Sequence, residues 1–474
     1  MRRIGVDFSI ATALIAAFGL CCAAGLYHAA APIGLPVPLD PDEGWNAYLQ
    51  ASAISGGALY PPANGFLINN YPPLSFYLIG GLGSWLGDNI VAGRIVSLVS
   101  FLFLTAAIAA CARAMDAQRT CATLGSLYFA AVLLLFSDYV AMNDPQLLGH
   151  AIQISGLYLL IRERRSAVTV FVAALLFVAS VFVKHNLVAL PLAALVWLFA
   201  YDRKAALRFG LAGAIFGALG LLAFRLTYGT SLLPFLASAR SYSLGNIERR
   251  GLAALPWVSV PSAGSALLVY FAHTDKFAVF CVLYAVIALG ASLFFLGGAG
   301  VDVNVLFDAA IALSLGAALV LERVAKLTIP ALAAIVALYL VPLALTRWLM
   351  PGSEWLSPEF WTHPLGDEAQ TARADIALLR DHPGPALCET LALCYWAGKR
   401  PAVDVFNLGE AFRTGARSDR ELLNRIDRGD FAIIEFEEPP PFGLGDNVEK
   451  AVEKNYRVLR IGDDGIFLVP RKSG

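Results

Sequence analysis

Long apolar runs follow one another along the first three quarters of the chain, separated by short polar connections. Crossing a hydrocarbon core takes roughly 20 helical residues, and eleven of these runs reach or approach that length. They cover residues 10–31, 90–112, 121–140, 147–161, 167–183, 187–201, 209–228, 252–272, 277–296, 305–321 and 327–349. The pattern predicts an all-α polytopic membrane bundle. Because the fourth, fifth and sixth runs are short, we expect them to be tilted little, to be extended by flanking residues, or to be shielded from lipid by neighbouring helices.

The connection between the first two runs, residues 32–89, is far longer than two adjacent spans require. Asp40-Pro41 has the composition of a helix start, with an acidic cap followed by proline. Pro72-Pro73 precedes a second apolar stretch, which we interpret as a short helix lying in the membrane interface. This connection therefore has structure of its own.

After the last apolar run, residues 351–474 have the charge content of a soluble protein. Strand-like runs at 431–436, 456–461 and 465–469 occur together with helix-like runs at 420–427 and 448–455. We therefore divide the chain into a transmembrane module, residues 1–350, and a small C-terminal α/β domain, residues 351–474.

Composition supports this division. Hydrophobic residues make up 58% of the 474, charged residues make up 15%, and the mean hydropathy is +0.65. A single soluble core could not bury so much apolar surface, so lipid must surround most of the chain. The 35 basic and 36 acidic residues leave a net charge of −1, which excludes a generally polybasic, nucleic-acid-binding protein.

The basic residues also predict an orientation. With a cytoplasmic N-terminus, thirteen arginines and lysines lie in the inner loops and five in the outer loops, as the positive-inside rule requires. An odd number of spans then places the C-terminal domain outside the cytoplasm. The first run resembles a signal peptide but lacks a convincing small-residue cleavage site, so we expect it to be retained as a helix.

Ionisable residues at the outer membrane surface are the candidates for chemistry, since charges next to lipid persist mainly where they pair, bind or react. Asp42 and Glu43 open the first outer loop. A capping box made by Asp40 and Glu43 would explain most of this motif without chemistry, but it leaves Asp42 without a role. Asp144, in the turn between spans three and four, faces the same side and would supply a second carboxylate, although turn geometry alone also favours Asn-Asp-Pro there.

Cationic and polar residues on the same side suit an anionic head group. Lys184-His185, between spans five and six, and Arg94, one turn inside span two, could each contact a phosphate, although a lysine or arginine there could also simply extend to the interface. Asp302 and Asn304, after span nine, could bind a polar ligand or form a flexible turn. Arg240, Arg249 and Arg250 add positive potential to the loop after span seven.

Together these residues carry a resemblance to a family. Asp42-Glu43 in a long first outer loop, Tyr71-Pro72-Pro73 later in that loop and Gly93-Arg94 in span two resemble the GT-C superfamily of polyprenyl-phosphate-sugar-dependent glycosyltransferases. Within that superfamily, the chain is similar to the group of protein O-mannosyltransferases and lipid A aminoarabinose transferases, which is like glycosyltransferase family 39. The resemblance covers essentially the whole chain, but its motifs are short.

The resemblance implies an enzyme of a bacterial inner membrane that moves a sugar from a polyprenyl phosphate to a hydroxyl of a lipid, polysaccharide or protein. It assigns catalysis to Asp42 and Asp144, with Glu43 beside them, and contact with the donor to Lys184, His185, Arg94, Tyr71, Asp302 and Asn304. One displacement with Asp42 as general base would invert the anomeric centre. A divalent metal is compatible with this chemistry, but no acidic cluster in the sequence supports one.

Two other classes share the helical pattern. A transporter or flippase of lipid-linked sugars would more often show internal repeats and charges at the midplane of the bilayer. A non-catalytic scaffold would keep the helices and would not need Asp42. A further open question concerns Cys388 and Cys394, which an oxidising compartment would allow to form a disulfide.

Overall fold

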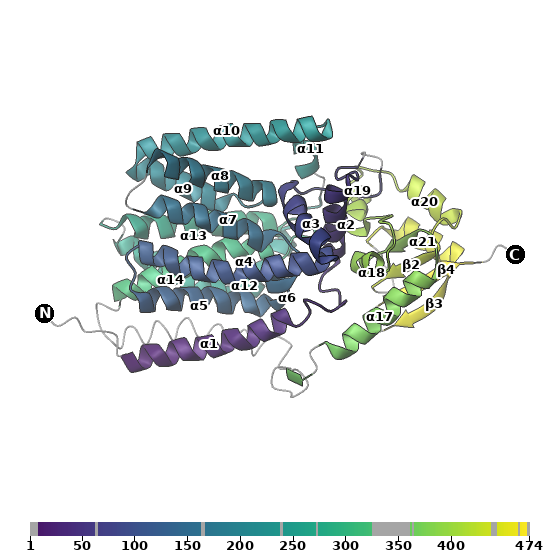
Figure 1. Cartoon of the computed structure of the whole chain (residues 1–474), viewed down its shortest axis with the longest axis horizontal. Helices are drawn as coiled ribbons and strands as arrows, with labels where there is room; N and C mark the ends of the chain where they lie inside the picture. Colours follow the sequence, from purple (N-terminus) through teal and green to yellow (C-terminus); the bar gives the residue numbers. More distant parts are fainter. Residues whose placement is uncertain are drawn as a thin grey trace.

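The computed structural model describes residues 8–61, 65–162, 166–237, 240–271, 274–324, 361–362, 365–437, 443–462 and 465–471. Its apolar part is a bundle of roughly parallel and antiparallel helices (Figure 1). The elements are α1 (Phe8–Ala30), α4 (Asn89–Ala114), α5 (Arg119–Leu133), η1 (Leu134–Phe136), α6 (Ser137–Ala141), α7 (Gln146–Ile161), α8 (Ala167–Val183), α9 (Ala189–Tyr201), α10 (Arg203–Tyr228), α11 (Leu233–Leu236), α12 (Leu244–Phe271), α13 (Lys276–Leu296), η2 (Val303–Leu306) and α14 (Phe307–Val324).

Six helical segments in the described part of the chain are long and apolar enough to cross a membrane: Asn89–Ala114, Arg119–Ala141, Arg203–Tyr228, Leu244–Phe271, Lys276–Leu296 and Val303–Arg323. The chain is thus a multi-pass membrane protein with a mostly helical fold. The short runs predicted as spans four to six are helices α7, α8 and α9, each of fewer than 18 residues. The predicted span 327–349 lies outside the described residues.

Burial differs between the helices of the bundle. α14 is buried on almost every side and packs against α5, α12 and α13. α10 instead exposes leucines along much of its length, as a helix in contact with lipid would. Of the three short helices, α7 packs against both α4 and α8 and is mostly buried. α8 and α9 instead expose large apolar side chains such as Phe171 and Phe199, so shielding by neighbours describes α7 but not these two helices.

The long first connection folds into α2 (Pro41–Ser55) and α3 (Leu74–Leu86). The side chain of Asp40 caps α2 by accepting a hydrogen bond from the backbone N–H of Asp42, and Pro41 occupies the first helical position. Both helices end at a glycine in the left-handed region, Gly56 at φ 77° and Gly87 at φ 83°. α2 and α3 pack against each other at the end of the bundle that faces the C-terminal sheet (Figure 1).

The C-terminal part combines a small sheet with short helices. Its elements are α17 (Gly366–Asp381), β1 (Ala386–Cys388), α18 (Leu391–Trp396), α19 (Val405–Arg413), α20 (Arg420–Asp427), β2 (Ile433–Phe436), α21 (Asp446–Asn455), β3 (Tyr456–Gly462) and β4 (Gly465–Pro470). The strand order is β1-β2-β4-β3, parallel between β1 and β2 and antiparallel at the other two pairings. A disulfide joins Cys388 at the end of β1 to Cys394 in α18.

The two parts of the chain meet where α18 packs on α2. Gly44 makes this contact close, because a Cβ there would lie 2.1 Å from the backbone nitrogen of Ala392. The Tyr48 hydroxyl donates to the Lys399 carbonyl at 2.8 Å, and the indole N–H of Trp396 donates to Asp88 at 2.9 Å. The C-terminal part is thereby held over the end of the bundle that carries α2 (Figure 1).

Candidate functional site

A cavity of 620 Å³ lies between the end of the bundle and the C-terminal part. Six residues that the sequence marked as candidates line it: Asp42, Tyr71, Lys184, His185, Asp302 and Asn304. Residues of the C-terminal part, among them Phe406, Asn407 and Glu437, complete its walls. The cavity therefore draws its lining from distant parts of the sequence, and neither part of the chain forms it alone.

Asp42 occupies the first turn of α2, half-buried in the wall of this cavity. Burial raises the pKa of its carboxyl group, and the charge of Asp144 raises that pKa further. Lys184 and Arg240 oppose the shift. Burial, together with repulsion from Asp42, also raises the pKa of Asp40 to about 8. The cavity thus holds two neighbouring carboxyl groups whose protons bind more tightly than usual.

Lys184 follows the last residue of α8, and its ammonium group donates to Asp144 Oδ2 at 2.7 Å. Both side chains are 3% exposed, so this is a buried ion pair. The other oxygen of Asp144 accepts from the backbone N–H of Gln146 at 2.7 Å. The Lys184 ammonium also lies 5.1 Å from the centre of the Tyr71 ring. Lys184 lines the cavity, whereas Asp144 does not line it and instead holds the Lys184 ammonium group.

His185 lines the cavity next to Lys184. Burial lowers its pKa to about 4, and the charges of Lys184 and Arg240 add to this effect. The imidazole is consequently neutral at neutral pH. It can donate a hydrogen bond to a ligand, but it brings no positive charge of its own.

Arg240 supplies the second cation of the cavity. Its guanidinium donates to the Ala299 carbonyl at 3.0 Å and to Asn407 Oδ1 at 3.1 Å, and it lies over the Phe406 ring at 5.5 Å. Because Asn407 and Phe406 belong to α19, the C-terminal part orients this arginine. In the sequence, Arg240 is one of three arginines in the loop after span seven, with nothing to distinguish it from Arg249 and Arg250.

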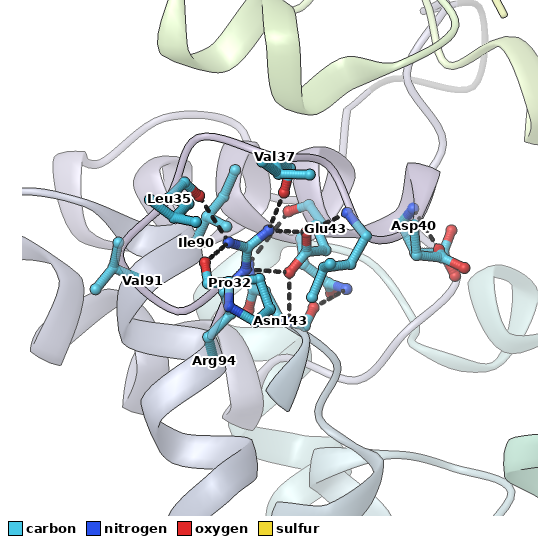
Figure 2. A network of polar contacts seen from close by, with 12 residues as sticks. Pro32, Leu35, Val37, Asp40, Glu43, Ile90, Val91, Arg94 and Asn143 are labelled. Atoms are coloured by element: carbon cyan, nitrogen blue, oxygen red, sulfur yellow. Dashed lines mark hydrogen bonds and ion pairs between the residues drawn. The ribbon is translucent and has the colours of Figure 1, made fainter. Parts of the chain in front are cut away.

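Glu43 and Arg94 do not reach the cavity, contrary to the sequence-based expectation. Both side chains are fully buried, and Arg94 donates to Glu43 from Nε at 2.8 Å and from Nη2 at 2.5 Å. Its remaining N–H groups donate to the carbonyls of Pro32, Leu35 and Val37 (Figure 2). A guanidinium has five N–H donors, and all of them are used here. Arg94 therefore has none left for a phosphate, and Glu43 holds it in place.

The same network fixes the turn that carries Asp144. Asn143 donates from its backbone N–H to Glu43 Oε1 at 2.9 Å (Figure 2). Its side chain exchanges hydrogen bonds with Gln50. Asn46 donates to the Asn143 carbonyl at 2.9 Å. Glu43 and Asn143 belong to this buried polar cluster. The cluster therefore also positions the residues next to them in the sequence, Asp42 and Asp144.

Asp302 and Asn304 line the cavity on the side of η2. The Tyr139 hydroxyl donates to Asp302 Oδ2 at 2.8 Å, so this carboxylate already has a partner. Among the described residues, no three His, Cys, Asp or Glu side chains converge in a way that could hold a metal ion.

No protein-family model matches the chain, and no curated protein matches its sequence. Solved structures do match. ArnT from Cupriavidus metallidurans in the apo state superposes with a TM-score of 0.63 at 13% identity, covering 97% of this chain and 98% of that one. The same protein bound to undecaprenyl phosphate gives 0.61 at 11% identity, covering 98% and 99%. The oligosaccharyltransferase of Archaeoglobus fulgidus, in a complex with Zn and sulfate, gives 0.53 at 10% identity, covering 88% and 67%.

The chain has the GT-C fold. The resemblance seen in the sequence is thereby confirmed at the level of architecture, from the first helix to the C-terminal part. Within this GT-C fold, the cavity occupies the end of the bundle that carries α2, and its C-terminal walls come from α19 and from the segments that follow β1 and β2. The residues that sequence reasoning missed, Tyr139, Phe406 and Asn407, reach the cavity only through this tertiary arrangement.

Proposed function

We propose that this protein transfers a sugar from a polyprenyl-phosphate donor to a hydroxyl acceptor at the outer face of the cytoplasmic membrane. The observation that carries the proposal is the convergence of Asp42 with Lys184 and Arg240 on one cavity at the end of an apolar bundle. A carboxylate can take a proton from an acceptor, and two cations can hold a phosphate. Undecaprenyl phosphate bound to a structure of the same fold supports a lipid donor of this kind.

The donor phosphate would contact Lys184 and Arg240, with His185 as a neutral hydrogen-bond donor beside them. Asp144 keeps the ammonium of Lys184 in position through its 2.7 Å contact. The polyprenyl chain would extend into the bilayer, and the sugar would lie in the cavity against Tyr71 and Asn304. As the phosphate leaves, its growing negative charge is stabilised by cations that are already in place.

Asp42 would act as the general base. The acceptor oxygen forms a bond to the anomeric carbon, its proton passes to Asp42, and the bond from that carbon to the phosphate oxygen breaks with its electron pair on the lipid phosphate. A single displacement inverts the anomeric centre. The raised pKa of Asp42 makes its carboxylate a stronger base than an exposed aspartate.

The proposed topology has a cytoplasmic N-terminus and an extracytoplasmic C-terminal domain, with residues 1–350 as the membrane module. The excess of basic residues in the inner loops and the disulfide in the C-terminal part support it. The proposed location is a bacterial inner membrane. The position of the charged cavity at one end of the bundle favours an enzyme over a transporter, whose polar path would cross the bilayer.

The test supplies purified full-length protein with polyprenyl-phosphate sugars one at a time, adds membrane extract as the source of acceptor, and follows transfer of label. Asp42→Asn removes the base and should lower transfer by at least about 100-fold, the usual contribution of general-base catalysis. Glu248→Gln is the matched control, since it removes an exposed carboxylate on α12 that lies outside the cavity. Full transfer by Asp42→Asn would contradict the proposed role of this residue.

A further inference from the structure

A second cavity, of 310 Å³, adjoins the first. Both cavities are lined by Tyr139 and Asp302, and the hydrogen bond between these residues forms their common boundary. The remaining walls of the second cavity come from η1, α6, α12, the end of α13 and η2. None of the functions assigned above uses it.

One face of α12 shapes this second cavity. Arg250, Ala253, Ala254 and Trp257 all line it, and their spacing of three, four and seven residues places them on one side of a helix. The two alanines have little side-chain volume, so the space lies between the guanidinium and the indole. Larger residues at these positions would fill it.

The polar groups of this face lack good protein partners. Trp257 is 1% exposed, and its indole N–H has no hydrogen-bond partner among the described residues. Arg250 reaches the carbonyls of Leu296 and Gly298 only at 3.4 Å from one nitrogen. Leaving a buried N–H unpaired costs free energy, and native structures rarely do so without a ligand or water to accept it.

The mixture of donors and acceptors indicates the chemical class of the ligand. Arg250 and Trp257 donate, whereas Asp138 and Asp302 accept. A phosphate only accepts, and both carboxylates would repel it. A hydrocarbon chain would leave the indole N–H of Trp257 without an acceptor and would add nothing to the two long contacts of Arg250. A polyhydroxylated group both donates and accepts, so it matches this lining.

We propose that the second cavity binds the sugar-like head group of an amphipathic acceptor. The apolar part of its lining, which includes Leu135, Phe136 and Leu306, suits the lipid end of such a molecule. The common boundary with the main cavity would bring a hydroxyl of this group toward Asp42. That this ligand is the acceptor of the reaction rests on the proposed function, whereas the binding of a hydroxylated amphiphile in the second cavity does not.

Native mass spectrometry of the full-length protein, purified in lauryldimethylamine oxide, tests the binding. Dodecyl maltoside, added below its micellar concentration, is the hydroxylated probe, and undecaprenyl phosphate is the second probe.

Trp257→Phe removes only the N–H and should weaken maltoside binding about fivefold, as loss of one hydrogen bond does. Arg250→Gln should weaken it about tenfold, because a charged donor contributes more. Ala253→Leu should block it by filling the space.

Arg249→Gln is the matched control, since Arg249 is exposed and does not line the cavity. It should leave maltoside binding unchanged, and every variant should bind undecaprenyl phosphate like the wild type. Equal maltoside binding by the wild type and the Arg250→Gln/Trp257→Phe double variant would overturn the proposal. So would loss of undecaprenyl phosphate in that double variant, which would assign the cavity to the donor. Because neither readout uses sugar transfer, a failure of the proposed enzymatic activity would be seen separately.

Discussion

Asp42 and Glu43 are adjacent acids with different environments. Adjacent residues on an α-helix point roughly 100° apart, so the two side chains of the first turn of α2 face different surroundings. Asp42 reaches the cavity, whereas Glu43 accepts from Arg94, Asn143 and Leu39 in the interior. Removing one partner of a buried ion pair typically costs about 3–5 kcal/mol, so Glu43 is better suited to structure than to proton transfer.

The charges around Asp42 predict how transfer depends on pH. A base works only when deprotonated, so kcat/KM should rise with pH through the raised pKa of Asp42 and then level off. Asp302 raises this pKa and Arg240 lowers it. Asp302→Asn should therefore move the acidic limb to lower pH, and Arg240→Gln should move it to higher pH. The measurement is the pH profile of sugar transfer for each variant, and shifts in the same direction would contradict this electrostatic account.

At this scale the sequence identifies the types of residue but not all of their roles. It marked Asp42, Lys184 and Asp144 from their position at the outer surface, and the structure brings all three together. It could not separate Glu43 from Asp42, because the partners of Glu43 lie in α4 and in the turn before α7. Likewise, Arg94 donates to three backbone carbonyl groups. Every residue has such a group, so the sequence does not indicate which of them bind Arg94.

The contact between α2 and α18 determines where α2, the helix that carries Asp42, lies. Gly44 is buried within α2, and the backbone of α18 passes directly over it. Tyr395 of α18 packs edge-on against Tyr48 of α2 with 5.4 Å between ring centres. The disulfide from Cys394 in turn ties α18 to β1. The position of Asp42 thus depends on a helix about 350 residues further along the chain.

Gly44→Ala should destabilise the protein and reduce transfer. Replacing glycine by alanine within a helix normally stabilises by about 0.5–1 kcal/mol. At Gly44 the new Cβ would meet the Ala392 backbone at 2.1 Å, and overpacking of this kind costs about 1–3 kcal/mol. Gly81→Ala in α3 is the matched control, because no atom lies within 4 Å of a Cβ there. Thermal unfolding should show opposite changes in Tm for the two variants, and a higher Tm for Gly44→Ala would contradict the close contact.

At the scale of the whole molecule, the apolar runs predicted the helices well. A segment in lipid must have apolar side chains and must pair its backbone N–H and C=O groups internally along its whole length, and a helix satisfies this. Each predicted run before residue 322 overlaps a helix in the structure, with differences mainly at the ends. The strand-like runs at 431–436, 456–461 and 465–469 likewise correspond to β2, β3 and β4. The docking of the C-terminal part over the bundle was not predictable. It depends on single close contacts such as Gly44 with Ala392, which leave no periodic pattern.

The disulfide provides a test of where the C-terminal part resides. Of the seven cysteines, Cys388 and Cys394 are bonded to each other, and the other five have thiol side chains outside any disulfide. Such a bond persists in an oxidising compartment. Protein taken from acid-quenched cells, denatured and treated with a polyethylene glycol maleimide, should gain five adducts without reductant and seven with it. Seven adducts without reductant would show that the bond is absent in the cell and would remove this support for an extracytoplasmic domain.

The main cavity has walls from both ends of the chain, from Asp40 near the first helix to Gly443 near the last. During synthesis, the early helices can insert long before the final strands leave the ribosome. Under the proposed topology, a half-made protein would have Asp42 on the outer side of the membrane but no enclosed cavity around it. For the proposed sugar transfer, this order of synthesis means that lipid-linked sugars would be protected until the chain is complete, because a truncated chain would lack the C-terminal walls that hold the donor against Asp42.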